Sequence, residues 1–177
     1  MRFTIAFHGP FAVSTGEAGR GCDNTVDSRC PLPGSSLKGV MRAGAGTIFP
    51  EHHVSAVFGT ARSPSPWSWT SAVFARPPET RRRARVSIDP LTRTAKDKAL
   101  TIAEEAWAET AAFEVLALSH VADPDGLHPL VLRAAAQAVH SLGMDRRRGL
   151  GWVTVLPERP LSDEDFTRIF DLGGIRA

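Results

Sequence analysis

The sequence predicts a single α+β domain. Segments with alternating apolar and polar residues, as in half-buried strands, occur near both ends of the chain and in its middle. Two other segments repeat apolar residues every three to four positions, as helices do. With 177 residues, 42% hydrophobic and 23% charged, the chain can bury a core as one globular unit. We therefore expect one domain spanning residues 1–177.

The first part of the chain predicts a strand, a long loop and a helix. Residues 2–13 alternate in polarity, which favours a strand. Residues 14–34 are rich in glycine and have no periodicity, and such long loops in compact domains are usually functional or mobile. The serine after Gly34 can cap a helix, whose buried face carries apolar residues at i, i+3 and i+4 from Leu37.

The middle of the chain predicts further strands and a projecting arm. Residues 67–73 alternate and stop before two prolines, and their two tryptophans are more typical of a core than of a base-stacking platform. Strands at 84–90 and 111–120 flank a polar stretch that is basic at its tip. A stretch of this kind is typical of a projecting hairpin.

The last part predicts a helix, a basic loop and a strand. A helix over 128–142 stops at Gly143, and a glycine-flanked basic loop leads into a strand over 151–156. A short helix with acidic residues at its start follows near the C-terminus. The simplest topology that contains this order is a ferredoxin-like βαββαβ fold with an inserted hairpin and long loops.

The charge distribution bears on the class of partner. The net charge is only +2, but basic residues cluster between 79 and 100 and again at 146–148. The arginine-rich run at 81–85 fits a nucleic-acid contact or a solvated strand edge equally well. No apolar run approaches the roughly 20 residues that cross a bilayer, and no secretory signal is recognisable. We expect a cytoplasmic protein with no membrane partner.

The segment over residues 30–46 resembles a phosphate-binding loop without matching the nucleotide pattern. Lys38 precedes Gly39 and no hydroxyl residue follows, so G-x-x-x-x-G-K-[ST] is not satisfied. Lys38 and Arg42 share a helix face near the positive N-terminal end, which suits a phosphate that is held and not transferred. Gly39 indicates either a close approach to the backbone or simply a poor helix residue.

Metal-binding and catalytic patterns are sparse. The two cysteines lie too far apart, and the adjacent His52 and His53 are too close, for a zinc motif, so we expect no structural metal. No nucleophile elbow is present. Asp23 and Asp27 could each bind a metal or orient the 2′-hydroxyl of an RNA, and an Asx-turn is the alternative interpretation of these aspartates.

Four segments taken together carry a resemblance to a known family. They are "CDNTVD" at 22–27, "PLPGSSLKGVMR" at 31–42, "VSIDPLTRTAKDKAL" at 86–100 and "LGMDRRRGLGWV" at 142–153. In this order they resemble the RAMP superfamily of CRISPR effector subunits, in particular the repeated backbone subunit of type III complexes. The resemblance implies an RRM-like domain whose copies form a filament along a guide RNA. The other partners would be a target RNA and further effector subunits.

The resemblance also implies roles for particular residues. Asp23, with Asp27 as second choice, would cleave target RNA with a transiently bound divalent metal ion, expected to be Mg²⁺. A thumb hairpin over roughly 86–115 would flip a target nucleotide at regular intervals. The residues expected to bind RNA are Gly34, Ser35, Ser36, Lys38, Arg42, Arg93, Lys96, Arg146, Arg147, Arg148, Gly149 and Gly151.

Two alternatives remain open within the same superfamily. The chain could be a structural RAMP subunit that orders RNA and cuts nothing. It could also be a guide-processing endoribonuclease that works alone and uses a histidine. The candidate histidines are His8, His120, His128 and His140, of which His140 is expected on the surface of the second helix.

Overall fold

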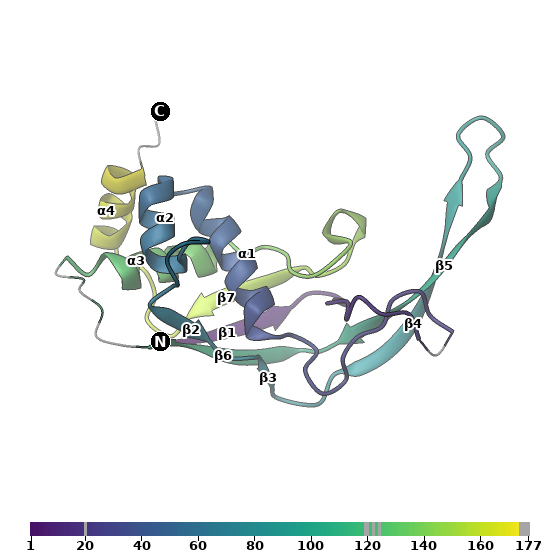
Figure 1. Cartoon of the computed structure of the whole chain (residues 1–177), viewed down its shortest axis with the longest axis horizontal. Helices are drawn as coiled ribbons and strands as arrows, with labels where there is room; N and C mark the ends of the chain where they lie inside the picture. The colour runs from purple at the N-terminus through teal and green to yellow at the C-terminus, as the bar shows by residue number, and fades with distance from the viewer. Residues whose placement is uncertain (20, 119–120, 122, 124, 174–177) are drawn as a thin grey trace.

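A central antiparallel sheet carries the helices on one face, and a long hairpin projects away from it (Figure 1). The structure is a computed structural model that describes residues 1–19, 21–118, 121, 123 and 125–173. Its elements are β1 (Arg2–Phe7), α1 (Gly34–Gly46), α2 (Glu51–Phe58), β2 (Trp67–Trp69), β3 (Val73–Phe74), β4 (Glu79–Ile88), β5 (Ala95–Trp107), β6 (Thr110–Ala117), α3 (Leu127–Gln137), the 3₁₀ turn η1 (Arg146–Arg148), β7 (Val153–Pro157) and α4 (Asp163–Gly173).

The main sheet has the strand order β2-β6-β1-β7, and β3 also pairs with β6. β1 therefore lies in the middle, with Phe3 opposite Phe113 of β6 and opposite Pro157 of β7. A βαββαβ chain in which the first strand pairs with the third and the last is the ferredoxin-like arrangement. The α+β, ferredoxin-like fold predicted from the sequence is confirmed.

The core lies between this sheet and the helices. Phe3 and Ile5 of β1 are fully buried, and the ring of Phe3 stacks on that of Phe113 at 5.1 Å between centroids. α1 crosses α3 closely because Gly44 has no side chain, and a Cβ there would lie 2.9 Å from the carbonyl oxygen of Ala135. α1 also contacts β2 and α3 contacts β7, so the apolar faces predicted for these two helices pack on the sheet.

The C-terminal helix α4 is held by a buried ion pair to α3. Arg133 donates two hydrogen bonds to the carboxylate of Asp165, at 2.7 and 2.9 Å, and this pairing lowers the pKa of Asp165 below its usual range. α4 is the acid-rich helix that the sequence predicts near the C-terminus.

Several element boundaries differ from the prediction. α1 begins after Pro33 with no side-chain cap, so the predicted serine cap is wrong and both serines lie in the first turn. α2 was not predicted at all. The strand predicted over 67–73 is divided into β2 and β3, and the helix predicted over 128–142 ends at Gln137. The two tryptophans contribute to the core, as predicted, with Trp69 only 9% exposed.

The projecting hairpin consists of β4 and β5, which pair along their length from Glu79 opposite Trp107 to Ile88 opposite Ala95. Along the sequence it lies between β3 and β6, and in space it extends far beyond the other elements (Figure 1). The hairpin therefore begins earlier than the residues 86–115 that the resemblance implies, and residues 110–115 belong to β6.

Candidate nucleic-acid interface

A groove between α1 and the loop before β7 brings together parts of three predicted segments. We call it the α1 groove. Its volume is about 430 Å³, and its lining residues are Val13, Ser14, Ser36, Gly39, Val40, Ala43, Gly143, Met144 and Arg146. Ser36 and Arg146, both predicted to bind RNA, thus lie in one concavity although they are remote in sequence. Ser36 lies in the first turn of α1, and its backbone N–H donates to Pro33 O at 3.0 Å.

The loop over residues 143–151, here called the glycine loop, is shaped by its glycines. Gly143 and Gly151 have positive φ angles of 78° and 75°, and a Cβ on either would overlap a neighbouring backbone carbonyl, of Ala12 and Leu142 respectively. The N–H of Gly151 donates to Pro10 O at 2.7 Å. Gly151, predicted to bind RNA, therefore has a packing role, whereas nothing lies within 4 Å of a Cβ built at Gly149.

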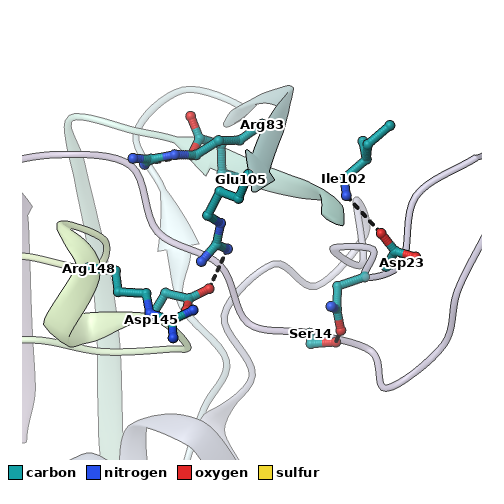
Figure 2. A network of polar contacts seen from close by, with 9 residues as sticks. Ser14, Asp23, Arg83, Ile102, Glu105, Asp145 and Arg148 are labelled. Carbon is teal, nitrogen blue, oxygen red and sulfur yellow. Dashed lines mark hydrogen bonds and ion pairs between the residues drawn. The ribbon is translucent and has the colours of Figure 1, made fainter. Parts of the chain in front are cut away.

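Asp145 ties the glycine loop to the hairpin (Figure 2). Its carboxylate accepts a short hydrogen bond from the Arg85 guanidinium on β4 and lies 3.7 Å from Nη1 of Arg148. The bond from Arg85 is the main reason that the pKa of Asp145 is lowered. A polar pocket of about 440 Å³ lies at this junction, lined in part by Asn24, Arg85 and Arg148. No local sequence pattern indicates this contact, because its partners are 60 residues apart.

The arginine-rich run on β4 is largely paired within the chain. Arg81 bonds to Glu79 at 2.8 Å and lies 5.0 Å from the centre of the Trp107 ring. Arg83 lies 3.5 Å from Glu105, and Arg85 pairs with Asp145 as described. These contacts support a structural role for Arg81, Arg83 and Arg85 at the base and middle of the hairpin.

The predicted cations at the hairpin tip are in a different situation. Arg93 and Lys96 are both exposed, and neither forms an ion pair with any other described residue. The tip also exposes Leu91, which is 92% accessible. Arg93 and Lys96 therefore remain available to a partner, but they lie far from the α1 groove (Figure 1).

Lys38 and Arg42, the two cations predicted to form one anion site on α1, contact different groups of the chain. Lys38 and Arg42 do share a helix face, but the Arg42 guanidinium donates to Gly59 O at 2.6 Å and to Glu51 at 3.0 Å. Arg42 therefore links α1 to α2. The ammonium of Lys38 lies 5.3 Å from the Trp69 ring centre. Neither side chain lines the α1 groove.

Gly39, in contrast, lies on the face of α1 that lines the groove. Apart from its chain neighbours and the backbone of α1 itself, no described residue comes within 4 Å of a Cβ built there. The backbone at Gly39 is thus open to the outside and does not pack against another element. Ser35, also predicted to bind RNA, is exposed on the first turn.

Asp23 lies beside Ile102 in the middle of the hairpin (Figure 2), and it does not line the α1 groove. Its backbone N–H donates to Ile102 O at 2.7 Å, and its carboxylate oxygen Oδ2 accepts the N–H of Ile102 at 2.7 Å. The Asp23 residue is exposed. In the next step of the same pairing, Glu104 N–H donates to Asn24 O at 2.9 Å. The loop therefore follows the edge of β5 and fixes one oxygen of the Asp23 carboxylate.

The contacts of Asp27 fit the alternative interpretation of the two aspartates, an Asx-turn. Its Oδ1 accepts the N–H of Arg29 at 2.8 Å, which is an Asx-turn. Within the described ranges, no three His, Cys, Asp or Glu residues gather closely enough to hold a metal ion. A metal at Asp23 would therefore not be held by three such side chains of the described residues.

The candidate histidines lie apart. His8 hydrogen-bonds through Nε2 to Thr154 at 2.7 Å, and His128 is buried and accepts a hydrogen bond from Trp67 at 3.1 Å. His140 follows the end of α3, so its expected place on the helix is wrong, and it is exposed. His120 lies outside the described residues.

The chain is similar to a known protein family and to proteins of known structure. A family model described as the RAMP superfamily matches residues 8–154. One solved structure to which the chain is similar is a cryo-EM structure of the Type III-B Cmr-beta bound to cognate target RNA, with a TM-score of 0.65 and 12% identity. The match covers 88% of this chain and 58% of that chain, and likeness at this identity concerns the fold. No curated protein matches the sequence.

Among the helices that the structure describes, none combines the length and the apolar character needed to cross a bilayer.

Proposed function

Because the chain belongs to the RAMP superfamily, we propose that it is a guide-RNA-binding backbone subunit of a type III CRISPR effector complex. Its partners would be guide RNA, target RNA, further copies of itself and other effector subunits. The α1 groove is the observation that carries this proposal, because it brings the Ser36 hydroxyl, in the first turn of α1, and the Arg146 cation into one concavity.

The lining of the groove is largely apolar, and its few polar groups are of kinds that bind an RNA backbone. Ser36 offers a hydroxyl near the positive end of the α1 helix dipole, whereas the Ser14 hydroxyl already donates to Asn24 Oδ1 at 3.2 Å. Arg146 adds a cation from the opposite wall. Groups of these kinds bind phosphate and sugar oxygens without reading sequence, which is what a guide of arbitrary sequence requires.

Binding can be tested by the salt dependence of RNA affinity. We expect Arg146→Ala to lower the slope of log K against log salt by about 0.7, because one phosphate contact on single-stranded RNA is lost. Arg42→Ala is the matched control, since Arg42 is paired with Glu51 and does not line the groove. Gly39→Leu, which would fill the groove, should weaken binding at every salt concentration. Unchanged binding by both groove variants would refute the proposal.

We propose further that Asp23 takes part in target-RNA cleavage with a divalent ion. The exposed Asp23 carboxylate fits such an ion, because Mg²⁺ at nucleic acids commonly takes one or two carboxylates and completes its shell with phosphates and water. A bound ion of this kind would stabilise charge on a phosphate oxygen. The chain's own contribution is to hold Oδ2 of Asp23 by the Ile102 N–H, so that the carboxylate has a fixed orientation.

The same hydrogen bond favours the second candidate, a structural subunit that does not cut. A carboxylate that accepts a strand-edge N–H has a packing role without any catalysis. The assembled complex with guide, complementary RNA and Mg²⁺ separates the two. Regular cuts that disappear in Asp23→Ala but persist in the Asx-turn control Asp27→Ala support cleavage. No cuts in the wild type support the structural candidate, and cuts by the lone chain in precursor guide without metal refute both.

A further inference from the structure

An exposed tryptophan lies at the start of the last strand, directly after the glycine loop. Trp152 is 61% exposed, which is unusual for the largest apolar side chain. β7 buries Val153 and Val155 against the core, so Trp152 projects from the opposite face of the sheet. This face is the one that the helices leave uncovered (Figure 1).

The backbone pairing around Trp152 places this residue next to Ser141, which lines a cavity together with three arginines. Ser141 and Trp152 form an antiparallel bridge, flanked by the bonds Leu142 N to Gly151 O at 2.9 Å and Val153 N to His140 O at 3.1 Å. In such a non-hydrogen-bonded pair the two side chains lie on the same face and close together. Ser141 itself lines a polar cavity of about 680 Å³, together with Asp145, Arg146, Arg147 and Arg148. Trp152 does not line the cavity itself but lies beside Ser141, which does.

The other neighbour of Trp152 is also held in place. The N–H of His8 donates to Trp152 O at 2.9 Å, which continues the register in which Phe7 is opposite Val153. His8 points to the same face, because its Nε2 hydrogen-bonds to Thr154 at 2.7 Å. The tryptophan is thus supported on both sides in a row of Ser141, Trp152 and His8.

The charge beside Trp152 indicates what would cover it. Arg146 and Arg147 are exposed and form no ion pair with another described residue, and Arg148 lies 3.7 Å from Asp145. A cationic cavity beside an exposed aromatic ring matches single-stranded nucleic acid, in which phosphates follow cations and bases stack on rings. An apolar protein partner would leave these guanidinium groups without acids.

We propose that Trp152 stacks on an unpaired base of the RNA whose backbone follows Arg146–Arg148. The inference rests on the proposed function, because it presupposes RNA at the glycine loop. It adds a base contact that tolerates any sequence, since every base has a π-face. Trp152 would then hold one nucleotide in register while the arginines hold its phosphates.

The test is a double-mutant cycle between the side chain and the base. Binding of a short unstructured RNA of mixed sequence is measured by fluorescence anisotropy, with each base in turn replaced by an abasic ribose. We expect Trp152→Leu, which keeps an apolar side chain but loses the π-system, to weaken binding about 5-fold or more. At one position the abasic RNA should weaken the wild type by a similar factor and leave Trp152→Leu unaffected. Trp152→Phe should retain most of the affinity.

Two controls give each result a single meaning. Leu156→Ala removes an exposed side chain from the same face of β7, away from the glycine loop, and should bind RNA as the wild type does. Trp152→Leu should leave the salt slope unchanged, whereas Arg147→Ala should lower it by about 0.7. Wild-type affinity in Trp152→Leu, with the slope still lowered in Arg147→Ala, would overturn this inference alone. Unchanged slopes in both Arg146→Ala and Arg147→Ala would overturn the proposed RNA site as well.

Discussion

The contact between Arg85 and Asp145 predicts a measurable link between the hairpin and the glycine loop. Asp145→Asn is the sharpest perturbation, because Asp145 has a φ of +55° and asparagine tolerates this left-handed conformation. The variant removes the charge and leaves the shape. The side chains of Arg85 and Asp145 are 22% and 14% exposed, between the surface and the interior. Since exposed pairs contribute about 0–1 kcal/mol and broken buried pairs cost about 3–5, we expect a loss of about 2 kcal/mol.

Urea unfolding of the wild type, Asp145→Asn, Arg85→Met and the double variant measures the coupling free energy directly. The dependence on pH provides a second check. The folded pKa of Asp145 is lowered by Arg85, so its stabilisation is present above the unfolded pKa of about 4 and is lost as pH falls through the folded pKa. The difference in unfolding free energy between wild type and Asp145→Asn should therefore narrow in acid. A coupling near zero, or a difference that stays constant in acid, would refute the reasoning.

Two further predictions concern packing and burial. Gly34→Ala should destabilise by about 3 kcal/mol in urea unfolding, because its Cβ would overlap Trp69 O, whereas Gly39→Ala should gain up to about 1 kcal/mol from helix propensity. A Gly34→Ala variant as stable as Gly39→Ala would contradict this. Asp165→Asn should lose about 3 kcal/mol at neutral pH, because it leaves the Arg133 guanidinium buried without its charged partner. An unchanged midpoint of thermal unfolding in Asp165→Asn would rule out this loss of stability.

Periodicity was enough to predict the order of strands and helices but not every element. Alternation in residues 2–7 and 153–157 survives as β1 and β7 because each strand has one face on the core. α2 escaped prediction although Val54, Val57 and Phe58 have helical spacing, because it spans only 8 residues and its first turn contains two histidines. The signal was present but short.

The site was less predictable, because sequence gives the residue types and not the direction of their side chains. The spacing of Lys38 and Arg42 did place them on one face, but the partner of Arg42 is Glu51 of the unpredicted α2. Ser36, two residues from Lys38, lines the α1 groove instead. No local pattern could show that Arg85 reaches Asp145, because pairing of this kind depends on where the fold places the hairpin and the glycine loop.

The glycine loop contacts both the proposed RNA sites and the hairpin, and we expect its variants to differ from variants of Asp23 in their effect on RNA binding. Arg146 reaches the α1 groove as well as the arginine cavity beside Trp152, while Asp145 fixes the loop to the hairpin. Asp23 lies elsewhere, on the edge of β5. Because the groups that would hold RNA and the carboxylate that would act on it are on separate segments, loss of Asp23 should leave RNA affinity intact. Changes in the glycine loop, in contrast, should affect binding and cleavage together.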